Sequence, residues 1–186
     1  MNSQSNRRQF LSRSLQWSVV ISAVNFPAWR RKGEAAPENL DNPTWRIGCY
    51  TRPWDKYDYR VALDAIAEAG FQYAGLMTCK SKSGLVISVQ TTEEEALKIG
   101  EETAQRNLEI LSVYGGGFPV DQSLQAGIDG LKTLIDRCAA VKTKNLLLGG
   151  VGSPDHFDAY YQAVAECCDY ALEQKVELAI KPHGGL

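Results

Sequence analysis

The segment VELAIKPHGGL, residues 176–186, joins a short apolar run directly to Lys181, His183 and a pair of glycines. A run of this length that ends in charged and glycine residues is typical of a buried strand whose carboxyl end opens onto a functional loop. Similar β-rich runs precede it along the chain, and helical patterns separate them. Residues 176–186 therefore predict the last of a series of strands in an α/β fold.

Upstream of this segment, strand-like and helix-like patterns alternate from Arg46 onward. The predicted strands cover residues 46–51, 73–78, 109–114, 145–149 and 177–181. Each predicted helix has its own start signal: Asp58, the capping box Thr92/Glu95, Ser123, and Ser153 followed by Pro154. Gly70 predicts the end of the first helix. Strands that alternate with helices predict a parallel sheet, because a helix is the usual crossover between parallel strands.

Three of the predicted helices carry apolar residues at helical spacing, which indicates a buried face. In the first helix these residues are Leu63, Ile66, Ala67 and Gly70. The stripe of the third helix consists of Leu124, Ile128, Leu131, Ile135 and Cys138. The stripe of the last helix consists of Phe157, Tyr160, Tyr161, Val164, Cys168 and Ala171.

The glycine motifs decide between the two main parallel α/β architectures. Neither residues 115–117 nor residues 149–152 form the GxGxxG pattern of a dinucleotide-binding open sheet. The sequence therefore favours a parallel (β/α) barrel of the TIM type. A complete barrel needs eight strands in about 250 residues. We expect this chain to be truncated after about four and a half βα units, with the catalytic half of the site beyond residue 186.

The N-terminal region differs in pattern from the barrel-like part. Residues 6–11, Asn-Arg-Arg-Gln-Phe-Leu, resemble a twin-arginine export signal, and the apolar run at residues 15–24 is too short and too polar to span a bilayer. We expect an export signal over residues 1–36, a linker over 37–45 and the barrel over 46–186. This organisation predicts export to the periplasm or cell envelope, with no stable membrane span after signal removal. A disordered basic tail on a cytoplasmic protein is the alternative.

Composition narrows the classes of partner. The net charge is -2 with a pI near 5.7, and no basic stripe follows residue 46, so we expect no nucleic-acid partner. The five cysteines lack a CxxC motif and the spacing of a zinc site. They are expected to be buried or half-buried free thiols.

Aromatic, cationic and glycine residues gather at the predicted carboxyl ends of the strands, where TIM barrels place their sites. We expect substrate contacts from Tyr50, Arg52, Trp54, Tyr114 and Gly116. Aromatic faces pack on sugar C–H surface, cations pair with oxyanions, and glycine lets backbone N–H groups approach a ligand. Lys181 and His183, at the end of the last strand, are the candidate catalytic residues.

Each candidate also has a structural alternative. Tyr50 and Trp54 are equally suited to packing under a loop. Arg52 could tie its loop to Asp55 or Asp58, and the glycine runs could form tight turns. His156, in the first turn of the predicted last helix, is expected to be solvated.

Four phrases, residues 46–54, 67–71, 112–117 and 178–183, resemble the xylose isomerase-like barrel superfamily, and within it the sugar phosphate isomerase/epimerase group. The resemblance implies a sugar or sugar-phosphate isomerase or epimerase, which transfers a proton next to a carbonyl and stabilises an enediolate. It also implies a divalent metal (Mn, Mg, Co or Zn) held by Glu, Asp, His and Glu of the later strands, and a small sugar or sugar phosphate as partner.

One position departs from the family pattern. In many members the fifth strand ends Glu-Asn-His or Glu-Pro-His, with the glutamate on the metal, whereas this chain has Lys181-Pro182-His183. Lys181 could stabilise an enediolate as a cation, or act as a base or carbonyl-condensing amine if burial neutralises it. The resemblance also offers His183 as a metal ligand or a substrate-positioning residue.

Two other functions fit the same features. One is a non-catalytic exported carbohydrate-binding barrel. The other is an abasic-site endonuclease, against which the acidic balance and the export signal both count. An unfinished barrel would also expose strand edges at residues 46–51 and 177–181, so we expect the chain to dimerise or aggregate.

Overall fold

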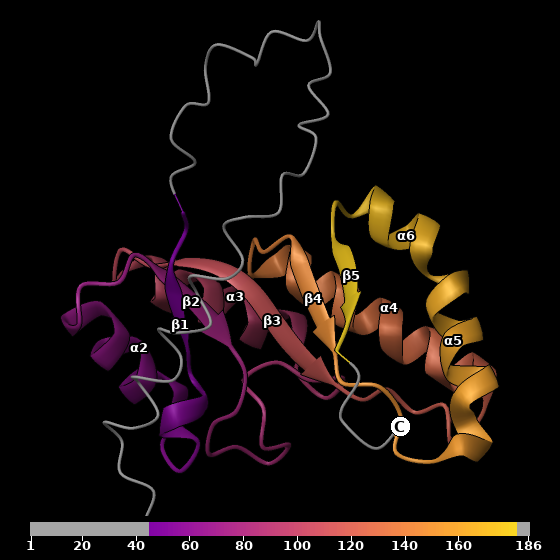
Figure 1. Ribbon diagram of the computed structural model, residues 1–186. Coiled ribbons are helices and arrows are strands. Elements are labelled where there is room, and N and C mark those ends of the chain that lie inside the picture. The colour runs from indigo at the N-terminus through magenta and orange to yellow at the C-terminus, as the bar shows by residue number, and fades with distance from the viewer. Residues whose placement is uncertain (1–44, 182–186) are drawn as a thin grey trace, which may run out of the picture. The chain divides into compact units, whose positions relative to one another are not determined.

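Five parallel strands form one sheet in the computed structural model, which describes residues 45–181 (Figure 1). They are β1 (Gly48–Tyr50), β2 (Tyr73–Leu76), β3 (Glu109–Gly116), β4 (Asn145–Leu148) and β5 (Glu177–Ile180). Their order in the sheet is β1-β2-β3-β4-β5, so each strand pairs with its neighbour in sequence. This is the strand order of part of a (β/α) barrel, which confirms the predicted fold class.

Several predictions fall outside the described residues. They concern the export signal, all of the linker except Trp45, and His183. Within the described residues, β1 and β5 form the two edges of the sheet. Self-association through these edges stays a prediction.

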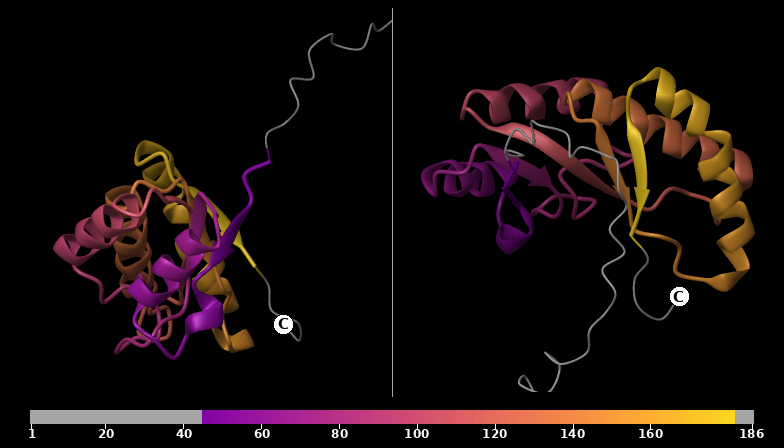
Figure 2. Two further views of the ribbon diagram at one scale, coloured as in Figure 1. Left: turned by 90° about the vertical axis from the view of Figure 1, so that its left-hand side faces the viewer. Right: turned by 45° about the horizontal axis from the view of Figure 1, so that its top comes forward.

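The helices lie along one side of the sheet (Figure 2). They are α2 (Tyr59–Glu68), α3 (Glu93–Ala104), α4 (Leu124–Ala140), α5 (Phe157–Glu166) and α6 (Cys168–Glu173), with short 3-10 helices η2 (Arg52–Trp54) and η3 (Pro154–His156). No helix within residues 45–181 combines the length and the apolar character that a membrane crossing requires.

The first three of these α-helices begin where the sequence predicts. Asp58 accepts a hydrogen bond from the Arg60 backbone N–H at 3.0 Å, and Ser123 accepts one from the Ala126 N–H at 3.0 Å. Thr92 and Glu95 form the predicted capping box. Each cap satisfies an amide that the first turn of a helix leaves without an intrahelical partner.

The last helical region differs from the prediction. Ser153 makes no side-chain capping bond, and residues Pro154–His156 form a 3-10 turn before α5 begins at Phe157. A second break at Cys167 separates α5 from α6. A 3-10 turn winds more tightly than an α-helix.

The buried face of α5 and α6 is the stripe Tyr160, Ala163, Cys167 and Ala171. Tyr160 and Ala171 are buried as predicted, whereas Tyr161 and Cys168 are exposed and Cys167 takes the inner position. The prediction that all five cysteines are at least half buried is therefore confirmed for four of them and wrong for Cys168.

The core lies between the sheet and the helices. Alternate strand residues such as Leu76, Val113 and Leu146 point toward the helices and are fully buried. They meet the inner stripe of α4, in which Leu131, Ile135 and Cys138 are buried, as predicted, and Leu124 and Ile128 are half buried. The opposite face of the sheet is therefore left free of this core packing.

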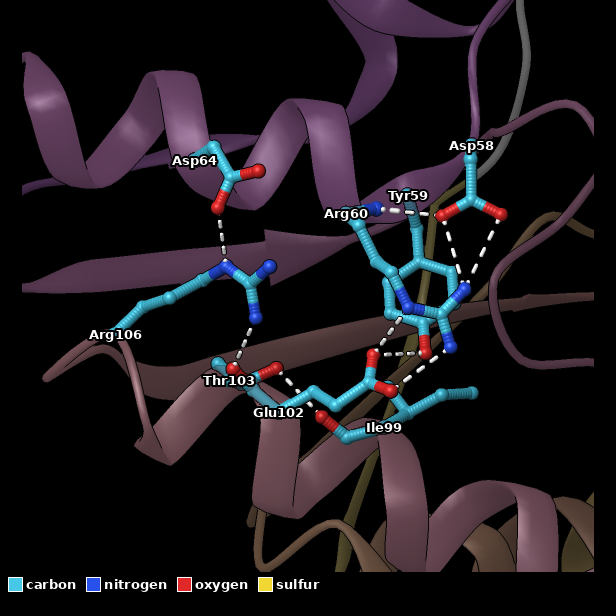
Figure 3. A network of polar contacts seen from close by, with 8 residues as sticks. All are labelled: Asp58, Tyr59, Arg60, Asp64, Ile99, Glu102, Thr103 and Arg106. Atoms are coloured by element: carbon cyan, nitrogen blue, oxygen red, sulfur yellow. Dashed lines mark hydrogen bonds and ion pairs between the residues drawn. The ribbon is translucent and has the colours of Figure 1, made fainter.

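A polar network joins α2 to α3 (Figure 3). Arg60 pairs with the carboxylate of Glu102 through two nitrogens at 2.7 and 2.9 Å, and the Tyr59 hydroxyl donates to the same carboxylate at 2.6 Å. Arg106 extends the network to Asp64 at 2.6 Å and to the Glu102 carbonyl at 2.7 Å. The Arg60 guanidinium lowers the pKa of Glu102, whereas burial and the bond to Glu102 raise the pKa of Tyr59.

Candidate functional site

We call the face of the sheet that points away from the helices its inner face. This face carries a hydrogen-bonded pair of side chains that spans three strands. Tyr50, Gly75 and Ser112 lie in register on β1, β2 and β3. The Tyr50 ring lies over Gly75, where an added Cβ would approach the ring to 2.5 Å, and the Tyr50 hydroxyl is 2.6 Å from the Ser112 Oγ. Glycine at position 75 therefore makes the room that this contact needs.

Tyr114 lies two residues after Ser112 on the same strand. Its half-buried side chain reaches across β4, and its hydroxyl lies against the Cα of Gly149, immediately after that strand. Ser112 and Tyr114 share the inner face because successive residues of a strand alternate between faces. Ser112 was not among the predicted site residues, although its spacing from Tyr114 was a signal that could have found it.

Lys181 follows β5 directly and is exposed. Its backbone N–H donates to the carbonyl of Leu148 at 2.9 Å, which continues the pairing of β4 with β5. Glu177 and Ala179 are exposed whereas Leu178 and Ile180 pack against the core, so the alternation places Lys181 on the inner face.

The loop after β1 contains the other two predicted contacts. Trp54 is half buried and packs against the core, whereas Arg52 is exposed. The structural alternative for Arg52 is wrong within the described residues: it forms no ion pair with Asp55 or Asp58, and Asp58 pairs with Arg60 instead. Substrate contact by Arg52 and Trp54 stays a prediction.

Gly116, the last residue of β3, has a structural reason to be glycine. Its φ is +71°, and an added Cβ would lie 2.6 Å from the Leu85 side chain. The pairing of β3 with β4 shifts register between Tyr114 and Gly116. A substrate contact by this buried residue stays a prediction.

Two cavities lie beside the carboxyl ends of the strands. One, of about 500 Å³, lies between α2 and the loop before α3, and its cationic lining residues are Arg60, Lys80, Lys82 and Lys98. The other, of about 320 Å³, lies between the loops that follow β3 and β4 and includes His156, which is half buried rather than solvated as predicted. Neither cavity was predicted from the sequence.

The described residues do not fit a metal site. Residues 45–181 contain no group of three His, Cys, Asp or Glu side chains placed to hold a metal ion. Lys181, at the position where the resemblance implies a metal-binding glutamate, contributes a cation. A metal site of the kind that the resemblance implies would therefore need ligands from outside residues 45–181.

Residues 63–186 match the xylose isomerase-like TIM barrel family, and the chain belongs to this family. No curated protein matches the chain.

The fold is shared by solved structures, three of which illustrate the similarity. A sugar phosphate isomerase/epimerase from Parabacteroides distasonis ATCC 8503 aligns with a TM-score of 0.53 and 11% identity over 81% of this chain and 56% of its own. A D-psicose 3-epimerase in the presence of D-fructose aligns with a TM-score of 0.51 and 11% identity over 72% of this chain and 52% of its own. A D-allulose 3-epimerase from Methylomonas sp. in complex with D-allulose aligns with a TM-score of 0.51 and 14% identity over 73% of this chain and 51% of its own. The chain thus spans about half the length of these structures.

Proposed function

We propose that this chain forms part of a sugar isomerase or epimerase that transfers a proton next to a carbonyl group. The observation that carries the proposal is the inner face of the sheet, where Tyr50, Ser112, Tyr114 and Lys181 lie toward the carboxyl ends of their strands. Sites of this fold lie at that end. Membership of the xylose isomerase-like family and the sugar epimerases among the structural neighbours support the proposal.

The proposed reaction begins when a base removes a proton from the carbon next to the carbonyl. The electrons of the broken C–H bond form the enediolate double bond, and the carbonyl π electrons move onto oxygen. The Lys181 ammonium stabilises this negative charge. Return of a proton to the opposite face of the same carbon restores the carbonyl and gives an epimer. Return of the proton to the former carbonyl carbon gives an isomer, provided that the hydroxyl proton of the neighbouring carbon moves to the former carbonyl oxygen, so that the carbonyl forms on the neighbouring carbon. No base is assigned within residues 45–181.

The hydroxyl groups of the inner face have a binding role in this proposal. Tyr50 and Ser112 already share one hydrogen bond, and each hydroxyl keeps the capacity for another. Hydroxyls of an open-chain sugar would use this capacity, while the aromatic rings of Tyr50 and Tyr114 pack on its C–H surface.

Solvent deuterium exchange tests the proposed reaction. The native protein, together with any sequence that follows residue 186, is incubated in D₂O with D-fructose, and separately with fructose 6-phosphate, with and without added Mn²⁺ or chelator. NMR then measures deuterium at the carbons next to the carbonyl. We expect Lys181→Met to reduce exchange by about 10²-fold, as loss of an oxyanion-stabilising group does. Lys144→Met, at the opposite end of the sheet, is the matched control and should leave exchange unchanged.

The alternative functions give different results. Sugar binding without deuterium exchange under any metal condition would replace the isomerase by a non-catalytic carbohydrate-binding barrel. Exchange that is equal in Lys181→Met and in the unchanged chain would remove Lys181 from the mechanism.

Export by the twin-arginine route also belongs to the proposal, and the sequence Arg7-Arg8-Gln9-Phe10-Leu11 supports it. Fusion of residues 1–36 to a reporter that is active only in the periplasm tests it. The double variant Arg7→Lys/Arg8→Lys should abolish reporter activity. Equal reporter activity in the two fusions would contradict export by this route.

A further inference from the structure

The cavity between α2 and the loop before α3 lies apart from the inner face of the sheet. Its volume of about 500 Å³ is within the range of small-molecule sites. Its walls come from the start of α2, the loop after β2 and the first two turns of α3. None of Tyr50, Ser112, Tyr114 and Lys181 lines it, so it is separate from the surface to which the proposed function assigns the sugar.

Cations outnumber carboxylates in the lining of this cavity. The cationic lining residues are Arg60, Lys80, Lys82 and Lys98, and the acidic ones are Asp58 and Glu95. The whole chain, by contrast, has a net charge of -2. This local excess of positive charge favours an anionic ligand.

Both carboxylates of the lining are already engaged. Asp58 pairs with Arg60 at 3.2 Å, and Glu95 accepts a hydrogen bond from the Thr92 backbone N–H at 2.8 Å. The other three cations of the lining form no ion pair within residues 45–181; they are Lys80, Lys82 and Lys98. The charges of these lysines are therefore the ones that an anion in the cavity would neutralise.

The loop that carries Lys80 and Lys82 also leaves backbone donors unused. The Gly84 N–H donates to the Ser81 carbonyl at 3.2 Å, which closes a turn with Lys82 and Ser83 at its centre. The N–H groups of these two central residues make no hydrogen bond within the described part of the chain. Consecutive free N–H groups in a turn form a concave site for an anion.

Hydrogen bonds hold this turn in place. The Cys79 N–H donates to the Gly84 carbonyl at 3.1 Å, and the Ser81 hydroxyl donates to the Leu85 carbonyl at 2.8 Å. Gly84 has a φ of +74°, which glycine adopts without strain. Because the turn is already formed, its donors lose little conformational freedom when a ligand binds.

We propose that this cavity binds a small molecule that carries a phosphate group, through the side chains of Lys80, Lys82 and Lys98 and the backbone of the turn. A phosphate group has three strong acceptor oxygens and up to two negative charges, which suit ammonium and backbone N–H donors. Leu85 and Ile99 offer apolar surface to the organic part of the ligand. The site goes beyond the proposed function, because its ligand is not the sugar of the inner face.

Backbone amide NMR tests the proposal on the native protein, together with any sequence that follows residue 186, with methyl phosphate as the probe. We expect titration to shift the amide signals of Lys82, Ser83 and Gly84. Lys82→Gln should weaken binding by about tenfold or more, as loss of a hydrogen bond to a charged group does.

Lys56→Gln is the matched control. Lys56 is exposed in the loop before α2 and is not among the lining residues, so its substitution removes the same charge outside the cavity. It should leave the affinity for methyl phosphate unchanged. Exposed lysines contribute little to stability, so both variants are expected to fold.

The dependence on pH separates a phosphate from other anions. A phosphomonoester gains its second negative charge near pH 6, whereas sulfate keeps the same charge from about pH 5 to about pH 7.5. No histidine is among the described lining residues, so no imidazole changes the charge of the cavity in this range. We expect the affinity for methyl phosphate to rise about tenfold relative to that for sulfate.

Three results would overturn the proposal. They are the absence of amide shifts in the turn, equal losses of affinity in Lys82→Gln and Lys56→Gln, and a ratio of methyl phosphate to sulfate affinity that does not change with pH. The second result would mean that the net charge of the protein attracts the anion without a site. All three are independent of deuterium exchange, so failure of this proposal is distinguishable from failure of the proposed reaction.

Discussion

The first three βα units and the fourth begin their helices in different ways. From β1 to α4, each α-helix begins with a side-chain cap from Asp58, Thr92 or Ser123. Between β4 and β5, Ser153 forms no capping bond and the helix breaks at Cys167. The difference teaches that side-chain caps set where the first three α-helices begin, whereas the helical region after β4 begins and breaks without one.

The largest expected difference is in the free energy of unfolding, and it separates two leucine substitutions. Leu134 in α4 is fully buried, whereas Leu172 in α6 is 76% exposed. Leu134→Ala should lower the free energy of unfolding by about 2–5 kcal/mol, because it removes buried apolar surface and leaves a cavity. Leu172→Ala should change it by less than about 0.5 kcal/mol. Urea unfolding followed by circular dichroism measures both, and equal losses would contradict this contrast between the two regions.

The second comparison concerns stability at alkaline pH and the thiols of Cys138 and Cys168. Burial raises the pKa of the Cys138 thiol from 9.0 to about 12, whereas Cys168 is exposed. The folded chain keeps this proton while the unfolded chain loses it, so the contribution of Cys138 is full below pH 9.0 and disappears toward pH 12. Cys138→Ala should flatten the alkaline fall in stability by up to about 1.4 kcal/mol per pH unit.

Urea midpoints collected across this alkaline range measure the slope. Tyrosines contribute equally to both chains, so the difference between Cys138→Ala and the unchanged chain isolates the thiol. Cys168→Ala should leave the slope as it is. A slope that Cys138→Ala does not alter would contradict the burial of this thiol in solution.

The third pair compares two glycines. Gly75→Ala should lower the free energy of unfolding by about 1–3 kcal/mol, because the added Cβ meets the Tyr50 ring at 2.5 Å. Gly152→Ala meets nothing within 4 Å and should be nearly neutral. In the double variant Tyr50→Ala/Gly75→Ala, the cost of the second substitution should disappear. If it persists, the Tyr50 ring is not what excludes a side chain at position 75.

The smallest expected difference concerns helix caps. Thr92→Ala removes a hydrogen bond of 3.1 Å to the Glu95 N–H and should cost about 1 kcal/mol. Ser153→Ala removes no capping bond and should cost less than a few tenths of a kcal/mol. Thermal unfolding resolves the two, and a comparable loss in Ser153→Ala would show that its cap forms in solution.

The success of the fold prediction follows from where its signals reside. The caps at Asp58, Thr92 and Ser123 depend on residues a few positions apart, so the sequence displays them directly. The Ser153-Pro154 pair displays the same signal, yet it leads into a 3-10 turn. The incorrect burial of Tyr161 and Cys168 came from the choice of stripe, since the buried positions are Tyr160, Ala163, Cys167 and Ala171. Two neighbouring apolar residues, such as Tyr160 and Tyr161 or Cys167 and Cys168, leave this choice open in the sequence.

The site shows the same limit. The places of Tyr50, Tyr114 and Lys181 at the carboxyl ends of strands follow from strand alternation, and Ser112 could have been added by the same rule. The role of Gly75 beneath Tyr50 needs the register of two strands.

The network between α2 and α3 has a consequence for recombination between relatives. Glu102 on α3 is held by Arg60 and Tyr59, both of which belong to α2. A chimera that received α2 from a relative without these two residues would leave the Glu102 carboxylate without its counter-ion. The two helices are therefore expected to be inherited together, and a crossover point between them is one that a functional hybrid would avoid.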